Sequence, residues 1–234
     1  MRKDLSRDAG YSDTTIVIPV KDEPAVWNVA KGVATSLPGS TIIIIYKSAS
    51  GRLGYGKRGM SFERGRLILV RQRDNGKGLA CIRAARMVKT PIMCLIDGDA
   101  TYEPDDLKAM VGQVRKGVDM VLGNRLANVE LEAMPRFIQT GNGILTATAN
   151  LLYGMDIKDS QTGIRAIRLS SWRKMALSEK NFGIESEMNI KARKRGLKVL
   201  EIPVHYYLRV GTTKQRKVVD GIKLFLMTFK FLFS

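Results

Sequence analysis

The first half of the chain alternates between short apolar runs and longer amphipathic stretches. Residues 15–20 (TIVIPV) have the length and composition of a strand. Residues 41–46 (TIIIIY) contain no polar alternation, which predicts a strand buried on both faces of a sheet. Between them, residues 23–37 carry apolar side chains at three- and four-residue spacing, which predicts a helix with one apolar face: Ala25, Val26, Val29 and Val33.

The same alternation continues along the chain. Helices are predicted over residues 78–88 and 104–116, and strands at three further apolar runs: 67–70, 91–96 and 120–122. This β-α-β-α order predicts an α/β fold with a Rossmann-like, doubly wound, mostly parallel sheet flanked by helices. In that fold class, ligands bind at the carboxyl ends of the strands.

Residues 51–66 show neither the helical nor the strand period. They contain five glycines and five basic residues and too little apolar content to pack. We interpret this segment as a mobile basic loop. Two roles stay open for it: a solvated, variable insertion, or a segment that holds phosphates or lipid headgroups.

The pattern changes after Asn124. A long helix is predicted over residues 135–153 and a strand over 198–204. Residues 218–234 are apolar almost all round, with Lys223 and Lys230 seven residues apart and therefore on one side of a helix. Because this stretch is too short to cross a bilayer core, an amphipathic interfacial helix at a membrane surface is favoured. The alternative is a helix packed on the domain formed by residues 1–217.

The composition excludes several classes of protein. The chain has 234 residues, of which 44% are hydrophobic and 26% charged, which excludes disorder, collagen and coiled coil. Its formal charge of +17 favours an anionic partner such as a nucleotide or an acidic membrane. Cys81 and Cys94 are too few for a disulfide framework, residues 1–10 have no apolar core resembling a signal peptide, and no apolar run reaches ~18 residues. We therefore expect a cytoplasmic protein that does not span a membrane.

The strongest local motif is the triplet Asp97-Gly98-Asp99, directly after the apolar run MCLI. Two carboxylates at the end of a strand can present oxygens to one divalent cation, whose remaining ligands would be water and diphosphate oxygens. We expect Gly98 to let the backbone turn there without steric cost.

Several motifs together resemble one family. The runs VIPVKDEP, RQRDNGKGLA, LIDGDATYEPDDL, LGNRL, DSQTGIRAIR and EIPVHYYLRVGTTK occur in the order found in inverting nucleotide-sugar glycosyltransferases of the GT-A fold, family 2 type. The chain is most similar to dolichyl- or polyprenyl-phosphate hexose (mannose or glucose) synthases, over about residues 14–217. The resemblance implies a catalytic domain at residues 1–217. Together with the apolar pattern after it, this leaves a C-terminal amphipathic, membrane-associated helix at 218–234.

The resemblance also implies the donor site. Pro19 and Glu23 would line the nucleotide pocket, and Asp22 stands where the family usually has Asn; Asp22 and Glu23 would also suit capping of the following helix. Lys77, in the turn Asn75-Gly76-Lys77-Gly78, would lie near the nucleotide. Asp97 and Asp99 match the family's metal and sugar triplet, with Mg²⁺ or Mn²⁺ as the cofactor. Thr101 stands where close relatives have Gln as a further ligand.

One position departs from the family. Where its relatives carry Asp-Asp-Gly-Ser after the second strand, this chain has Tyr46-Lys47-Ser48-Ala49. Lys47 lies in the expected nucleotide site, but an ammonium has only donors and cannot accept the N–H of uracil or guanine. Either another group reads the base, or the donor nucleotide is unusual.

The basic residues of the later motifs point to phosphates. Arg125, Arg136 and Arg209 look like binders of donor or acceptor phosphate, and Lys214 matches the Lys of a family motif. An acceptor hydroxyl would instead need a general base, for which Glu185, Glu187 or Asp159 are available; a phosphate acceptor is already ionised. His205 is interpreted as structural, or as lying near the acceptor.

These observations predict a metal-dependent enzyme in which Asp97, Asp99, Arg125 and Arg209 are catalytic. It would transfer a hexose with inversion to polyprenyl or dolichyl phosphate at the cytoplasmic face of an anionic membrane, with or without a separate transmembrane partner. The alternatives are a glycosyltransferase that extends a glycan at a sugar hydroxyl, a scaffold with a decayed site, and a basic nucleic-acid-binding domain. No known RNA-module pattern or zinc spacing supports the last, so no nucleic-acid partner is expected.

Overall fold

The computed structural model describes residues 10–48, 66–129, 133–209 and 217–231. Within them lies one seven-stranded sheet, with the strand order β3-β2-β1-β4-β6-β5-β7. β1 pairs in parallel with β2 and β4, β2 with β3, and β5 with β7, whereas β6 runs antiparallel to both β4 and β5. The strands are β1 (Thr14–Lys21), β2 (Thr41–Lys47), β3 (Arg66–Arg71), β4 (Ile92–Leu95), β5 (Met120–Val129), β6 (Arg165–Arg168) and β7 (Val199–Tyr206).

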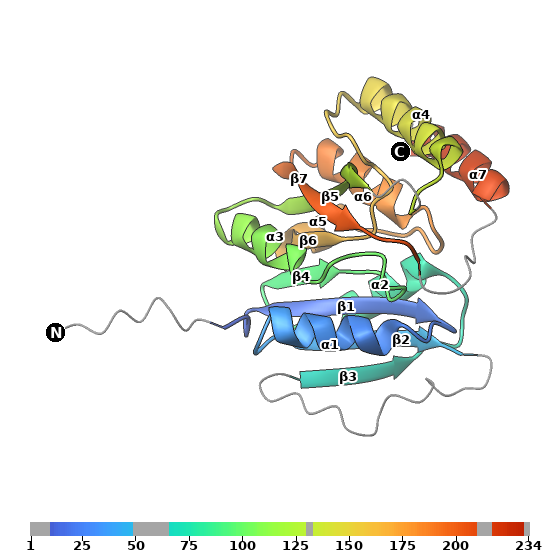
Figure 1. Cartoon of the computed structure of the whole chain (residues 1–234). Coiled ribbons are helices and arrows are strands. Elements are labelled where there is room, and N and C mark those ends of the chain that lie inside the picture. The colour runs from blue at the N-terminus through green and yellow to red at the C-terminus, as the bar shows by residue number, and fades with distance from the viewer. Residues whose placement is uncertain (1–9, 49–65, 130–132, 210–216, 232–234) are drawn as a thin grey trace.

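Helices cover both faces of this sheet (Figure 1). On one face, α1 (Val26–Ser36) and α3 (Asp106–Arg115) contribute to one buried apolar cluster. On the other, α2 (Lys77–Ala85), α5 (Leu169–Met175) and α6 (Ile184–Lys194) contribute to a second cluster. The predicted doubly wound, mostly parallel architecture is confirmed.

β2 shows why the two clusters need a strand without polar alternation. Ile42 and Ile44 pack into the cluster under α1 and α3, and Ile43 and Ile45 into the cluster under α2. All four are buried. Because successive side chains of a strand point to opposite faces, a central strand covered on both sides must be apolar at every position.

The predicted boundaries shift in several places. The helix expected over 23–37 begins only at Val26 and ends at Ser36, because residues 22–25 form a bend and a turn after β1. β5 extends from Met120 to Val129, beyond the apolar run that ended at residue 122, and the helix expected over 78–88 ends at Ala85. The expected basic loop falls almost entirely on residues 49–65, which lie outside the described residues. Arg66 belongs to β3 rather than to that loop.

One strand, β6, was not predicted from the sequence. β6 (RAIR) has charged residues at both ends, yet the Arg165 side chain is fully buried. Its guanidinium donates to Asn189 Oδ1 and to the backbone oxygens of Ser160 and Thr162. These bonds replace the water that a buried cation loses, so a strand with charged ends can lie inside the sheet, between β4 and β5.

The two remaining helices lie side by side at one end of the molecule (Figure 1). α4 (Arg136–Tyr153) packs against α7 (Lys217–Lys230), and the Tyr153 hydroxyl donates to the backbone oxygen of Thr228. Thr228 is buried in this contact, whereas Ile222 and Leu226 remain exposed. Among the described residues, no helix combines the length and apolarity that crossing a membrane requires.

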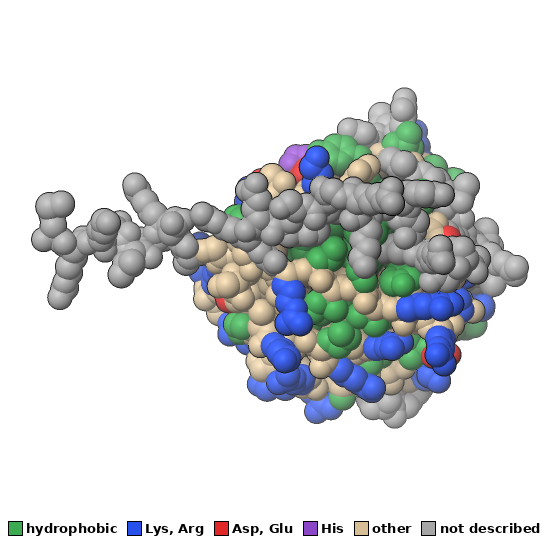
Figure 2. Space-filling view, turned by 90° about the horizontal axis from the view of Figure 1, so that it is seen from below, with side chains coloured by type: hydrophobic (Ala, Val, Ile, Leu, Met, Phe, Trp, Pro, Cys, Tyr) green, Lys and Arg blue, Asp and Glu red, His purple; other side chains and the backbone are tan. Residues whose placement is uncertain are grey.

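Positive charge is spread over one face of the molecule. Figure 2 shows Lys and Arg side chains distributed over the face seen from below, with few acidic side chains among them. The same face leaves apolar side chains visible between the cations.

Candidate active site

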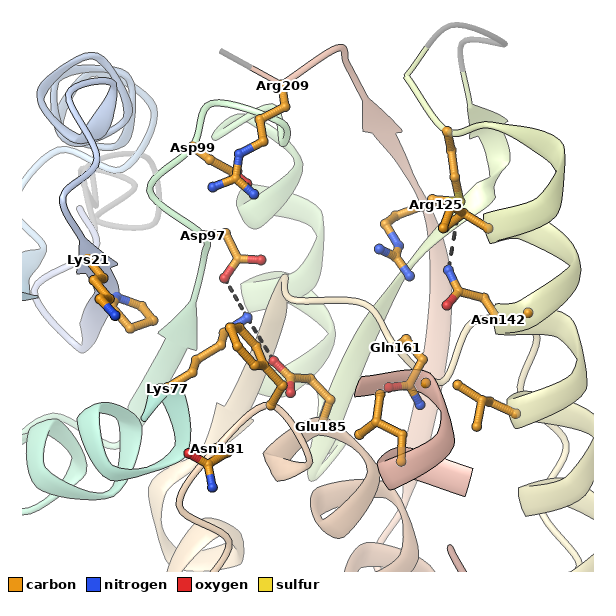
Figure 3. A pocket seen from close by; sticks show the side chains of 18 of the residues that line it. Lys21, Lys77, Asp97, Asp99, Arg125, Asn142, Gln161, Asn181, Glu185 and Arg209 are labelled. Atoms are coloured by element: carbon orange, nitrogen blue, oxygen red, sulfur yellow. Dashed lines mark hydrogen bonds and ion pairs between the residues drawn. The ribbon is translucent and has the colours of Figure 1, made fainter. Parts of the chain in front are cut away.

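A cavity of about 980 Å³ opens at the carboxyl ends of the parallel strands. Its polar part is lined by side chains from the ends of β1 to β4, from β5, from the starts of α2 and α6, and from the segment after β7. These include Pro19, Glu23, Lys47, Lys77, Asp97, Asp99, Arg125, Glu185 and Arg209. Figure 3 shows Lys77, Asp97, Asp99, Arg125, Glu185 and Arg209 around this polar part. Most of the residues predicted from the motifs therefore line one cavity.

Lys77, the first residue of α2, bridges two acids in this cavity. Its Nζ lies 2.5 Å from Asp97 Oδ1 and 2.7 Å from Glu185 Oε1. Burial alone would lower the pKa of Lys77, but the two carboxylates outweigh it and raise that pKa well above its usual value. The ammonium is therefore charged, and it fixes the position of Asp97 relative to α6.

Two glycines allow close contacts around Asp97, one with its carboxylate and one with β1. A Cβ on Gly163 would lie 2.1 Å from Asp97 Oδ2, so only glycine lets this backbone pass beside the carboxylate. A Cβ on Gly98 would lie 2.2 Å from Val20 Cγ1. The expected reason for Gly98 is wrong: the left-handed residue of this turn is Ala100, with φ 60°, and Gly98 is required by its contact with β1.

Asp99 is held by a hydroxyl and a guanidinium. Its Oδ1 accepts from the Thr101 hydroxyl at 2.7 Å, and its Oδ2 lies 3.3 Å from Arg209 Nη1. Arg209 also donates from Nη2 to Glu23 Oε2 at 2.7 Å. Burial and the charge of Asp97 raise the pKa of Asp99, against the opposing effects of Thr101 and Arg209.

Asp97 and Asp99 can supply some, but not all, of the oxygen ligands of a hard divalent cation. Both Asp97 and Asp99 present carboxylate oxygens to the cavity, and oxygen ligands suit Mg²⁺ and Mn²⁺. Within the described residues, however, no group of three or more His, Cys, Asp or Glu side chains gathers at one point. Two protein ligands leave room for water or diphosphate oxygens. The Thr101 hydroxyl donates to Asp99, so here it orients that carboxylate.

Arg125, on β5, was expected to bind a phosphate through its guanidinium, but this guanidinium is paired with an acid of the protein itself. Its Nε and Nη2 each donate at 2.7 Å to the fully buried carboxylate of Asp159, and its guanidinium lies over the Tyr206 ring. Asp159 raises the pKa of Arg125 well above its usual value, against the lowering effect of burial. Arg125 still lines the cavity, and its role toward a phosphate stays a prediction.

The other predicted basic residues lie outside this polar cluster. Arg136 is exposed at the start of α4, and Lys214 lies outside the described residues. His205 is exposed; its backbone N–H donates to Asp106 Oδ2, its Nδ1 lies 3.1 Å from Asp106 Oδ1, and it is not among the residues that line the cavity. The structural interpretation of His205 is the better one.

The end of the cavity where the motifs predict the nucleotide lies at β1, β2 and β3. Pro19, Glu23 and Lys47 line it, while Asp22 is exposed, with φ 45°, and does not. Lys47 donates from Nζ to the backbone oxygen of Arg73 at 2.8 Å. The expected capping by Asp22 or Glu23 is wrong, because α1 has Ala25 as its N-cap residue and no side-chain cap bond.

Of the three acids considered as a general base, two have carboxylates that already accept hydrogen bonds from other residues of the protein. Asp159 is paired with Arg125, and Glu187 accepts from the backbone N–H of Ser178 and Glu179. Glu185 alone lines the cavity, and there it faces Lys77.

Two glutamines that we did not identify from the motifs also line the cavity. Gln72 follows β3 and donates from Nε2 to the backbone oxygens of Asp74 and Gly76, which fixes the turn before α2. Gln161 precedes β6 and lies across the cavity from Lys77 (Figure 3). Each is a polar residue next to a strand end within a quoted motif, which is the signal that could have identified it.

The cavity continues into an apolar groove between α4 and α7. Residues of both helices line this part: Phe137, Ile138, Leu145, Ile222, Phe225 and Leu226. One cavity therefore joins a charged end at the sheet with an apolar end at the helix pair.

Comparisons with known proteins agree with this architecture. The family model described as "Glycosyl transferase family 2" matches residues 15–173. The chain is 33% identical over 178 residues to glycosyltransferase AglJ of Haloferax volcanii, covering 75% of this chain and 58% of that protein. It is 30% identical over 153 residues to a dolichyl-phosphate hexose transferase of the same organism, covering 65% of this chain and 66% of that protein. The matches thus span less than two thirds of each relative.

A solved structure shares the fold. Glucosyl-3-phosphoglycerate synthase from Mycobacterium tuberculosis, in complex with Mn²⁺, UDP-glucose and glycerol 3-phosphate, superposes with a TM-score of 0.67. The sequence identity is 15%, and the match covers 92% of this chain and 78% of that one. At this identity, the likeness establishes the arrangement of strands and helices only.

Proposed function

Because the chain belongs to glycosyl transferase family 2, we propose that it transfers a hexose from a nucleotide-diphosphate sugar to a polyprenyl or dolichyl phosphate. The observation that carries the proposal is the cavity with two chemically different ends. Its charged end, with Lys77, Asp97 and Asp99, suits a sugar diphosphate, and its apolar end between α4 and α7 suits a prenyl chain. The dolichyl-phosphate hexose transferase among the relatives supports this acceptor.

The distribution of acids favours a phosphate over a hydroxyl as the nucleophile. An attacking alcohol must lose a proton to a base, and the carboxylates of Asp159 and Glu187 are already hydrogen-bonded inside the protein. Glu185 Oε1 lies 2.7 Å from the Lys77 ammonium, so this oxygen is also engaged within the protein. A phosphate oxygen is ionised and needs positioning alone.

The reaction is a direct displacement at the anomeric carbon. An oxygen of the acceptor phosphate forms the new bond as the bond to the donor diphosphate breaks, and the nucleoside diphosphate leaves with the electron pair. Asp97 and Asp99 would hold a divalent cation that neutralises the leaving diphosphate as a Lewis acid. Lys77 adds a second positive charge, and Arg125, Arg136, Arg209 and Lys214 are the proposed holders of the acceptor phosphate. Displacement from the opposite side inverts the anomeric configuration.

The helix pair supports attachment to a membrane. α4 contains no acidic residue, and Arg136 is its single charge. Phe137, Ile144 and Leu151 recur every seven residues along it, with 63%, 55% and 85% of their surface exposed. Ile222 and Leu226 of α7 are exposed by 57% and 63%. This apolar surface beside basic residues suits the cytoplasmic face of an anionic membrane, alone or with a separate transmembrane partner.

The test compares acceptors that differ only in their nucleophile. Vesicles containing polyprenyl phosphate or polyprenol of the same chain length are mixed with the protein, Mn²⁺ and a panel of UDP-glucose, UDP-N-acetylglucosamine and GDP-mannose. Mass spectrometry should detect a hexosyl lipid phosphate with at least one donor and no product with polyprenol. Transfer to polyprenol or to an oligosaccharide, with none to the phosphate, would favour a hydroxyl-extending transferase.

A further inference from the structure

We infer that Gln161 recognises a hydroxyl group of the transferred hexose, which makes it a specificity-determining residue; this inference rests on the proposed function. The strand order positions the ligand. Pro19, Lys47 and Gln72 mark the nucleotide end at β1 to β3, and the Asp97–Asp99 pair follows β4. A hexose attached beyond the diphosphate then faces the next strand along this edge, which is β6.

The segment 159–163, which precedes β6, reaches the cavity beside the acidic pair. β6 is antiparallel to β4, so its N-terminal side lies at the carboxyl edge of the parallel strands. Gly163 passes close enough to Asp97 that a Cβ would meet Oδ2 at 2.1 Å. Gln161, two residues earlier, lines the same cavity as Asp97, Lys77 and Glu185 (Figure 3).

Most other polar groups of residues 159–163 form hydrogen bonds that fix the position of this segment. The Asp159 carboxylate binds Arg125, the Ser160 N–H donates to the Thr146 hydroxyl, and the Gly163 N–H donates to the Tyr102 hydroxyl at 2.7 Å. The buried guanidinium of Arg165 donates to the backbone oxygens of Ser160 and Thr162, the two residues on either side of Gln161. Such a frame fixes one side chain in the cavity to within a narrow range.

The carboxamide of Gln161 is itself oriented. Its Nε2 donates to Ser160 Oγ at 2.9 Å and to Ser186 Oγ at 3.0 Å, which uses both of its hydrogens. The Oε1 atom has no protein donor among the described residues, and it is an acceptor with two lone pairs. Ser186 follows Glu185 in the first turn of α6, so the residue that orients Gln161 adjoins the acid that pairs with Lys77. The site therefore offers a fixed acceptor, and sugar hydroxyls are its natural donors.

The experiment measures binding with and without the hexose. Calorimetry in the presence of Mn²⁺ compares UDP with UDP-glucose and UDP-N-acetylglucosamine, and GDP with GDP-mannose. For the sugar that binds, Gln161→Leu should raise Kd five- to tenfold, the size of about one hydrogen bond, and leave the Kd of the nucleoside diphosphate unchanged. Gln139→Leu, which removes a glutamine of α4 that donates to Met134 O and does not line the cavity, should change neither.

A second pair of measurements guards against a purely structural effect. Ser186→Ala removes one of the two bonds that orient the amide, and it should weaken nucleotide-sugar binding by a smaller factor without affecting the diphosphate. Deoxy analogues of the bound sugar should include one that binds more weakly to the unaltered protein but equally well to Gln161→Leu. Equal losses for sugar and diphosphate in both variants would overturn the inference and leave the proposed function standing. Failure of every nucleotide sugar and nucleoside diphosphate to bind the unaltered protein would overturn both.

Discussion

The ammonium of Lys77 lies 2.5 Å from Asp97 and 2.7 Å from Glu185, so one half-buried cation joins the carboxylate after β4 to a carboxylate in the first turn of α6. Removing one member of such a group leaves like charges facing each other without a counter-ion. The relationship therefore predicts that Lys77 supports both the fold and the donor site.

Lys77→Met should lower the free energy of unfolding by about 3 kcal/mol, because the two acids lose their common partner. Lys47→Met is the matched control: it removes a lysine from the same cavity, but one that donates to a backbone oxygen, and it should cost less than about 1 kcal/mol. Urea denaturation at neutral pH measures both. Equal costs for the two variants would contradict the assigned role of the bridge.

Glu185 and Glu187 are two residues apart, yet substitutions at the two positions should have different effects, on donor binding and on stability respectively. Glu187 accepts from two backbone N–H groups and pairs with Lys191. Burial alone would raise the pKa of Glu187, but these partners lower it below its usual value. Glu187→Gln should therefore destabilise the protein by about 1–2 kcal/mol at pH 7. Glu185→Gln should instead weaken donor binding.

The pH dependence follows from the sign of that shift. A carboxyl whose pKa is lowered on folding stabilises the protein above its unfolded pKa, and the stabilisation is lost as the pH falls through the folded value. The difference in stability between the unaltered protein and Glu187→Gln should therefore be constant near neutral pH and shrink below about pH 4. Thermal melts across this range test it, and a difference that grows on acidification would refute the assignment.

Gly163→Ala tests whether the close approach to Asp97 matters for the site. The new methyl group would displace the Asp97 carboxylate, so Mn²⁺ binding in the presence of UDP or GDP should weaken about tenfold or more. Gly112→Ala lies on α3, where a Cβ meets nothing within 4 Å, and it should leave Mn²⁺ binding unchanged. Electron paramagnetic resonance of Mn²⁺ reports both affinities, and normal binding by Gly163→Ala would be the contrary result.

The apolar surface of α4 and α7 should control binding to lipid. Leu226→Glu puts a charge on a residue that is 63% exposed, and it should reduce co-flotation with anionic vesicles about tenfold. Leu200→Glu, on an exposed leucine of β7, serves as the control and should have little effect. Equal flotation of both variants would exclude this surface as the membrane contact.

The sequence predicts those parts of the molecule where one local pattern decides the outcome. β2 is apolar at each central position because both faces are covered, and Asp97 and Asp99 are recognisable because they follow an apolar strand directly. The motif order then identifies the family, which the family model over residues 15–173 confirms.

What the sequence does not predict depends on partners that are distant along the chain. Arg125 looks like an open phosphate binder until Asp159 is placed against it, and Arg165 looks like a surface residue until Asn189 and two backbone oxygens surround it. The role of Gly163 is visible only once Asp97 lies beside it. In each case the deciding contact forms on folding and leaves no local pattern.

Metal-dependent transfer to a lipid phosphate is tested by the rate at which the protein forms hexosyl polyprenyl phosphate from its nucleotide sugar in anionic vesicles with Mn²⁺, measured beside Asp99→Asn. We expect a product with inverted anomeric configuration for the unaltered protein. The rate for Asp99→Asn should be at least a hundredfold lower, because the leaving diphosphate is no longer neutralised. An undiminished rate in Asp99→Asn, or transfer only to hydroxyl acceptors, would refute the proposed function.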